Sequence, residues 1–328
     1  MKRKKIALFV MSIATTLSLT CCNSDSTNTE ENTTSAASTE RVAQNIPERF
    51  KEGYGETTSV VPKATGYEYD RESLTYDLVW SDEFDGDELN TDDWTYEIGM
   101  GQWGWGNNEL QSYTNGDNAT VKDGILTIEL RKEKGENGGD KYTSTRIKTA
   151  NSHCWKYGKI EMSAKLPSGK GTWPAFWMMP KESAYGGWPD SGEIDIMEFV
   201  GYTPGIIYNT IHCDAFNGAD GTQKGFGSRI EDCSEAFHTY AVEWLPDKMI
   251  FTVDGEETFT YDPNEFAKPA GKSQWPYDKE FYIILNFAWG GNWGGARGTD
   301  DSVLPQTYQI DYVRVYQSKE ITALTANE

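Results

Sequence analysis

From residue 76 onward the chain consists of short apolar or alternating runs separated by turns rich in glycine, aspartate, asparagine and proline. Such runs are typical of β-strands. They predict strands at residues 77–80, 124–131, 158–165, 172–179, 192–200, 206–213, 237–245, 249–253, 257–261, 281–289 and 309–316. No long helix-period run and no internal repeat interrupts them, so the sequence predicts one large, all-β sandwich domain over residues 76–318, followed by a tail at 319–328.

The predicted strand at residues 172–179 has two different faces. Side chains alternate along a strand, so Phe176 and Met178 share one side while Trp173 and Trp177 share the other. If the first pair packs between the sheets, the two tryptophans form a platform suited to consecutive sugar rings. A strand that is buried on both sides is the alternative.

One stretch sets three carboxylates among apolar side chains, which is costly unless the acids have a function. In a regular strand Glu193 and Asp195 would share a face and Glu198 would point to the other. One extra residue would bring all three acids onto the same face, and such β-bulges are over-represented beside active sites. The spacing therefore predicts a bulge at Ile196 and Met197.

Two carboxylates on one strand face suggest glycoside hydrolysis. Retaining enzymes hold the pair about 5–5.5 Å apart and inverting enzymes about 6.5–9.5 Å, so neighbouring positions on one strand favour retention. One glutamate would attack the anomeric carbon, while the other would donate a proton and then activate water. A calcium site and an acidic strand edge that discourages aggregation are the alternatives.

Composition narrows the choice of partners. The 51 acidic and 30 basic residues give a net charge of −21, which argues against nucleic acid or anionic lipid and fits an uncharged substrate. The 12 tryptophans and 18 tyrosines suit stacking on sugars, although a large sandwich also packs aromatic rings in its core. Cys213 and Cys233 leave a pairing open, but with Cys154 the odd number does not form a disulfide framework.

The N-terminal residues have the pattern of an export signal. A basic start precedes an apolar run that is too short to span a membrane. Leu19, three residues before Cys22, resembles the lipobox of bacterial lipoproteins, which predicts a signal peptide at 1–22 and a lipid on Cys22, with Cys21 as the less favoured acceptor. An ordinary secretory signal is the alternative. Residues 23–40 are predicted to be a flexible tether, and 41–75 a strap or linker. The protein is expected to be exported and anchored to the outer membrane or cell surface only through the lipid.

Residues 193–198 (EIDIME) resemble the ExDxxE signature of glycoside hydrolase family 16, in the β-bulged branch that includes laminarinases and related endo-β-glucanases. The resemblance is supported by further motifs at residues 80–84, 105–111, 157–161, 173–177, 188–189, 286–293 and 310–316. It implies a concanavalin A-like β-jelly roll with an open cleft on its concave face, and catalysis without a cofactor.

The resemblance also implies roles for single residues. It makes Glu193 the nucleophile, Asp195 its assisting carboxylate and Glu198 the general acid/base. The residues expected to line the cleft are Trp173, Trp177, Trp188, Asn108, Arg146 and His212. For the last three, structural roles stay open: a turn cap, a surface ion pair and a satisfied structural histidine, respectively.

Many members of the family hold a structural Ca²⁺ on the convex side. Glu83, Gly124 and Asp311 match the positions of its ligands, and oxygen ligands suit this hard cation. The alternative is that the two acids cap strands or pair with lysine or arginine.

Trp289 is a departure from the family pattern. Laminarinases usually have a small aliphatic residue at this position, and a tryptophan that faced the cleft would reshape a sugar subsite. That possibility makes mixed-linkage β-1,3/1,4-glucan a serious candidate beside β-1,3-glucan of the laminarin type.

The sequence as a whole predicts a monomeric retaining endo-β-glucanase whose partner is a β-glucan polysaccharide. One alternative is a β-glucan-binding protein that has lost catalysis, although such relatives generally lose one of the acids and all three are present here. Another is a related hydrolase of agar, carrageenan or xyloglucan. Sulfated galactans usually require a basic cleft, and a net charge of −21 does not suit them.

Overall fold

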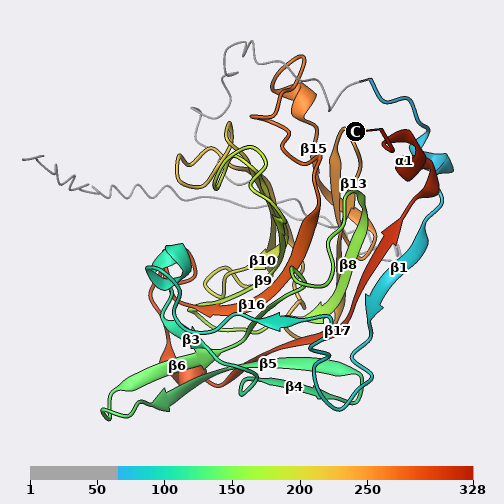
Figure 1. Cartoon of the computed structure of the whole chain (residues 1–328). Helices are drawn as coiled ribbons and strands as arrows, with labels where there is room; N and C mark the ends of the chain where they lie inside the picture. The colour runs from blue at the N-terminus through green and yellow to red at the C-terminus, as the bar shows by residue number, and fades with distance from the viewer. Residues whose placement is uncertain (1–65, 328) are drawn as a thin grey trace, which may run out of the picture. The chain divides into compact units, whose positions relative to one another are not determined.

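The computed structural model describes residues 66–327, which form two β-sheets packed face to face (Figure 1). The first sheet has ten strands: β15 (Glu256–Tyr261), β14 (Met249–Val253), β13 (His238–Trp244), β8 (Gly158–Lys165), β17 (Gln306–Gln317), β5 (Ile125–Lys134), β6 (Asp140–Ser144) and β3 (Gln111–Tyr113), with β1 (Asp77–Asp82) beside β17 and β4 (Ala119–Lys122) beside β5. The second has seven: β12 (Lys224–Arg229), β11 (Ile206–His212), β10 (Glu193–Phe199), β9 (Thr172–Pro180), β16 (Phe281–Trp289), β7 (Arg146–Lys148) and β2 (Thr95–Tyr96).

Every predicted strand is present, which confirms the all-β sandwich. The strands that the pattern missed are β2, β3, β4, β6, β7 and β12. Most of them have only two to five residues, too few to show a period of two, and β12 contains two glycines. The predicted tail at 319–328 contains a short helix, α1 (Lys319–Leu324), which is capped by Ser318 and buries Ile321.

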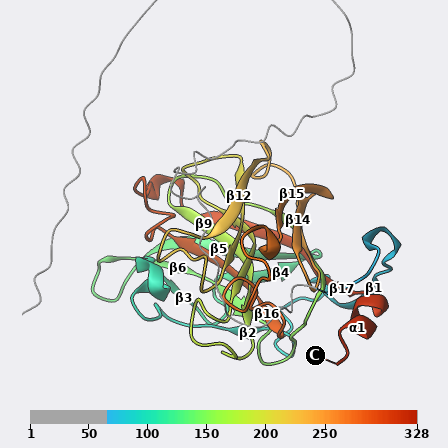
Figure 2. The same cartoon turned by 90° about the horizontal axis from the view of Figure 1, so that it is seen from above.

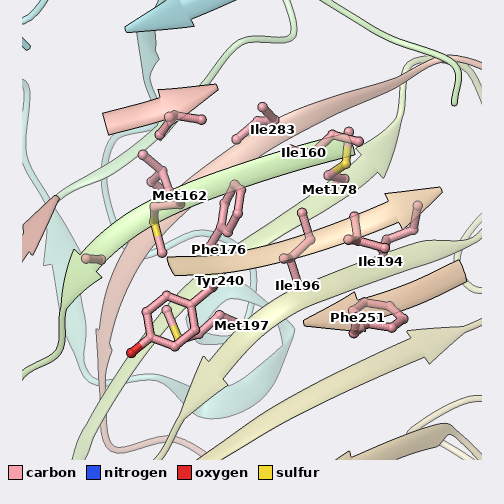
Figure 3. Close-up of a cluster of buried hydrophobic side chains, with 14 of the residues drawn as sticks. Ile160, Met162, Phe176, Met178, Ile194, Ile196, Met197, Tyr240, Phe251 and Ile283 are labelled. Atoms are coloured by element: carbon pink, nitrogen blue, oxygen red, sulfur yellow. The ribbon is translucent and has the colours of Figure 1, made fainter. Parts of the chain in front are cut away.

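The hydrophobic core lies between the sheets, and β9 and β10 each supply one face to it. Figure 3 shows Phe176 and Met178 of β9 beside Ile194, Ile196 and Met197 of β10, all fully buried. The opposite face of the seven-stranded sheet, here called the outer face, carries the side chains that alternate with these. Trp173 and Trp177 lie on it partly exposed, so the two-faced prediction for this strand is confirmed and the strand buried on both sides is excluded.

The first described residues lie against the ten-stranded sheet. Tyr69 donates a hydrogen bond to Asp247, while Arg71 and Tyr76 both contact Glu243 of β13 at 2.7 Å. The signal peptide at 1–22 with Cys22, the tether at 23–40 and the strap up to residue 65 lie outside the described residues. Between residues 66 and 327, no helix is both long and apolar enough to cross a membrane.

The three described cysteines, Cys154, Cys213 and Cys233, are free thiols. Cys213 and Cys233 are both buried, so the possible bridge between them does not form in the structure. Apolar burial also raises the pKa of both thiols, which keeps them protonated and unreactive.

Candidate active site

The predicted bulge in β10 is confirmed. The pairing of β10 with β11 shifts register between Asp195 and Glu198, and its pairing with β9 shifts there too. Ile196 and Met197 are consecutive residues, yet both side chains are fully buried in the core. Glu198 therefore returns to the outer face, the face that already carries Glu193 and Asp195.

Two tryptophans hold the two glutamates from opposite sides. Trp188, in the loop that leads into β10, donates its indole N–H to Glu193 Oε2 at 2.6 Å. Trp173, on β9, donates its indole N–H to Glu198 Oε1 at 3.0 Å. Each carboxylate thus has one fixed donor and remains partly exposed on the outer face.

Asp195 lies between them and is 2% exposed. Its Oδ2 atom faces Nε2 of His212 on β11 at 3.2 Å. The backbone N–H of Gly218 donates to Nδ1 of His212 at 3.0 Å, so the neutral imidazole carries its proton on Nε2, the nitrogen that faces the aspartate. The structure therefore places His212 beside the acids.

Burial and neighbouring charges raise the pKa values of two of the three acids. Burial, followed by the charge of Asp195, raises the pKa of Glu198 well above its usual range. Burial, followed by the charge of Glu193 and a hydrogen bond to it, raises the pKa of Asp195 as well. Close carboxyls cannot all ionise freely, so the three acids titrate as one coupled group in which the neutral forms of Asp195 and Glu198 are favoured.

Further aromatic residues that the sequence did not single out extend the outer face. Trp293, in the loop after β16, packs edge-to-face on Trp173 with ring centroids 5.6 Å apart. Tyr208, on β11, packs on the same Trp293 at 5.0 Å. Trp293 ends the motif at residues 286–293, but its segment shows no strand alternation, so only the tertiary contact with Trp173 places it near the acids.

Arg146 lies between two tryptophans and is paired with an acid. Its guanidinium lies 4.6 Å from the ring centroid of Trp105 and 4.8 Å from that of Trp177, between the two rings. Nε of Arg146 also pairs with Glu97 at 2.5 Å, and only 12% of the side chain is exposed. Arg146 thus fixes the orientation of two tryptophans at the edge of the outer face. Asn286 holds Trp177 from the other side, accepting its indole N–H at 2.7 Å.

Asn108 lies exposed in a tight turn before β3, where its φ is +54°. Its side chain donates to Asn292 at 2.9 Å and so joins this turn to the loop after β16. The next residue, Glu109, is buried and accepts hydrogen bonds from Gln111 and Tyr113. Burial raises the pKa of Glu109. These bonds anchor the turn to β3 and to the loop after β16.

The prediction that Trp289 contacts substrate is wrong. Trp289 is 0% exposed and belongs to the core, 5.8 Å from the ring of Tyr142. β16 alternates regularly, so Trp289 shares the inner face with Phe287, Leu285 and Ile283. Trp289 therefore cannot shape a sugar subsite, and it gives no reason to prefer mixed-linkage glucan as the substrate.

The three expected calcium ligands do not form a free set of oxygens. Both carboxylate oxygens of Glu83 accept from Arg314, at 2.9 and 2.8 Å. This pairing lowers the pKa of Glu83. Asp311 accepts from Ser163 at 3.1 Å, and Gly124 occupies the turn between β4 and β5 with a φ of +76°. Glu83 thus follows the alternative expectation, pairing with a basic side chain.

Comparisons with known proteins agree with this geometry. The family model described as glycosyl hydrolases family 16 matches residues 106–314, which include all three acids. A second family model, described as beta-glucan synthesis-associated protein SKN1/KRE6/Sbg1, matches residues 5–192 and stops just before them.

Individual relatives support the same family. A beta-glucanase of Rhodothermus marinus is 44% identical over 248 residues, 74% of this chain and 85% of the relative. A glucan endo-1,3-beta-glucosidase of Cryptopygus antarcticus is 42% identical over 250 residues, 72% and 90% of the two chains. The crystal structure of the laminarinase from Rhodothermus marinus superposes with a TM-score of 0.71 at 43% identity, covering 75% of this chain and 99% of that one. With its acids on one bulged strand of a jelly-roll sandwich, the chain belongs to glycosyl hydrolase family 16.

Proposed function

We propose that this protein is an endo-β-glucanase that hydrolyses β-1,3-glucan with retention of configuration. The observation that carries the proposal is the bulge of β10, since it sets Glu193, Asp195 and Glu198 on one face beside partly exposed tryptophans. A protein that only bound glucan would not need three converging carboxyls, two of which, Asp195 and Glu198, have pKa values raised by burial.

In the proposed reaction Glu198 is protonated at the start and gives its proton to the glycosidic oxygen as the bond breaks. Glu193 attacks the anomeric carbon and forms a glycosyl-enzyme. Glu198, now a carboxylate, takes a proton from water, and the resulting hydroxide displaces Glu193 from the sugar. Asp195, whose raised pKa favours its protonated form, supports Glu193 by donating a hydrogen bond to it, and it does not attack.

The substrate class is proposed from the named relatives and from the chemistry of the face. The partly exposed indole rings of the outer face suit stacking on uncharged sugar rings, and the net charge of −21 disfavours sulfated polysaccharides. A reducing-sugar assay on laminarin should show release of oligosaccharides. Faster hydrolysis of lichenan than of laminarin would instead identify mixed-linkage glucan as the substrate.

The roles of the two glutamates are tested by azide rescue. In Glu193→Ala, azide should replace the missing nucleophile and give an α-glycosyl azide from an activated β-glucoside. In Glu198→Ala, azide should attack the glycosyl-enzyme and give the β-anomer. The exposed Glu136 provides a control, since Glu136→Ala should keep full activity. Exchanged anomers would reverse the assignment, and full activity in either mutant would disprove it.

The family resemblance also implies a structural calcium ion. The residues fit this ion poorly, because both carboxylate oxygens of Glu83 already accept hydrogen bonds from Arg314. We therefore expect the melting temperature to change by less than about 2 °C between EDTA and calcium chloride, on a scale where about 1 kcal/mol shifts a domain of this size by roughly 2–4 °C. A larger increase with calcium that Asp311→Asn abolishes would establish the ion.

Export and lipid anchoring also belong to the proposal, and they rest on the sequence alone. Labelled palmitate should be incorporated into the wild-type protein and into Cys21→Ser but not into Cys22→Ser. Incorporation into Cys22→Ser would reject Cys22 as the acceptor.

The domain is proposed to act as a monomer, which size-exclusion chromatography of residues 66–328 would test.

A further inference from the structure

A buried amide lies directly opposite the bulge of β10. Two residues of β10, Ile196 and Met197, oppose a single residue of β11, Asn209. Asn209 is fully buried on the inner face of β11, where its neighbours along the strand are Ile207 and Ile211. An amide among isoleucines is unfavourable unless its hydrogen bonds are made. Its partners therefore indicate why it is there.

The amide of Asn209 connects the bulge to the other sheet. Its Nδ2 donates at 2.7 Å to the carbonyl oxygen of Ile196. Ile196 has no pairing partner on either β9 or β11. Its Oδ1 accepts at 2.7 Å from the hydroxyl of Thr258 on β15. The seven-stranded sheet lies against β15 at this end of the sandwich, as Figure 2 shows for β12.

Thr258 also lies at a bulge, where it has no pairing partner on the neighbouring strand β14. The register between β14 and β15 shifts so that Phe259 and Glu257 have partners on β14 and Thr258 is skipped. Its buried hydroxyl also lies 3.1 Å from the carbonyl oxygen of Phe251. Two bulges in opposite sheets thus face one another, and the Asn209–Thr258 pair joins them through the core.

We infer that Asn209, held by Thr258, is a positioning residue that fixes the bulge of β10 and thereby the carboxyl of Glu198. The inference rests on the proposed role of Glu198. The peptide of Ile196 decides where the chain turns back to the outer face, and a slip of one residue in a strand reverses every side chain. A hydrogen bond to that carbonyl holds the bulge in one conformation, and the contact with the opposite sheet prevents the amide from rotating away.

The first test compares Asn209→Leu with Asn118→Leu. Asn118 is a matched control, because it is also buried, donates to the carbonyl oxygen of Glu129 at 2.8 Å and contacts the hydroxyl of Thr143. Asn209→Leu loses two side-chain hydrogen bonds and Asn118→Leu loses three, so both should unfold at lower temperature. Only Asn209→Leu should lose about 10- to 100-fold in kcat on laminarin, with KM changed less than about twofold, because small displacements of a catalytic group cost rates of this order.

The pH profile separates positioning from general destabilisation. Glu198 faces Glu193 and Asp195 on its own strand and His212 on β11, and burial raises its pKa. A bulge that relaxes toward solvent would reduce that burial, so the alkaline limb of kcat/KM in Asn209→Leu should move to lower pH. The profile of Asn118→Leu should match that of the wild type.

A milder pair of variants covers the case in which Asn209→Leu does not fold. Thr258→Val removes the hydroxyl and should lower kcat, whereas Thr258→Ser keeps it and should recover most of the activity. Equal kcat and pH profiles for wild type, Thr258→Val and any folded Asn209→Leu would overturn the inference. A wild-type protein that released no sugar from any glucan would instead contradict the proposed function.

Discussion

The three carboxyls of β10 have different neighbours, and the differences suit the proposed roles. Glu193 accepts a hydrogen bond from the indole N–H of Trp188, which orients its carboxylate. Asp195 is the most buried of the three and lies beside the imidazole of His212. Burial raises the pKa of Glu198, which suits a group that must be protonated when the reaction begins.

The bond from Trp173 to Glu198 predicts a shift of the pH profile. An N–H that donates to a carboxylate favours the charged form, so this bond lowers the pKa of Glu198 against the larger effect of burial. Trp173→Phe keeps an aromatic ring but removes the donor, and the pKa should rise further. The acid then stays protonated to higher pH, and the alkaline limb of kcat/KM should move upward. A downward shift would show that solvent reaches Glu198 when the indole is removed.

At the scale of elements, β9 and β16 show how alternation divides a strand between core and function. On β9 the outward tryptophans, Trp173 and Trp177, are partly exposed and hydrogen-bonded to polar side chains. On β16 the same alternation turns Trp289 inward and Asn286 outward, where it accepts from Trp177. Whether a tryptophan lies in the core or on the outer face therefore depends on which of the two alternating faces of the strand its position belongs to.

This division predicts opposite phenotypes for two tryptophan substitutions. Trp177→Ala removes an outer ring and should raise KM for laminarin about 10-fold or more, since stacking of one aromatic ring contributes about 0.5–1.5 kcal/mol beyond its buried area. Trp289→Phe trims a core ring and should cost about 1–3 kcal/mol of stability with KM unchanged. Initial rates and thermal unfolding measure the two effects. A change in KM with Trp289→Phe would return this residue to the sugar-binding face.

At the scale of the whole molecule, the sandwich places a costly acid cluster on a well-packed support. The inner faces of β9, β10 and β16 are fully apolar at their central positions, apart from the Asn209–Thr258 pair on the neighbouring strands. The cluster itself opposes folding when it is charged, because burial favours the neutral carboxyls. The packing of the apolar core must therefore compensate for the free-energy cost of the acid cluster.

The pH dependence of stability follows from this conflict. Asp195 and Glu198 have higher pKa values folded than unfolded, so the folded state binds more protons and stability falls as pH rises from the unfolded pKa values toward the folded ones. Glu198→Gln, which stays neutral, should melt at a higher temperature than the wild type at pH 8. The difference should disappear near pH 4, where Glu198 is protonated in both states. Scanning calorimetry at both pH values measures it, and a lower melting temperature at pH 8 would contradict the cost assigned to the charge.

Much of this was accessible from the sequence because period-two patterns need only local information. Apart from β6 and β12, the strands of five or more residues follow from alternation within one segment, as do the faces of β9 and the bulge at Ile196 and Met197. Asn209 carried a local signal as well, an amide at the position between Ile207 and Ile211 on an apolar face, but nothing in the sequence named its partner on β15.

By itself, the sequence determined the strand pattern, the face that carries Glu193, Asp195 and Glu198, and the family to which they point. Only the tertiary structure decided that Trp289 belongs to the core, and that Arg146 is held between two rings. It also decided that Thr258 holds Asn209. The physical reason is that alternation is set by the geometry of one strand, whereas a contact between strands depends on register, on sheet order and on which sheets pack together.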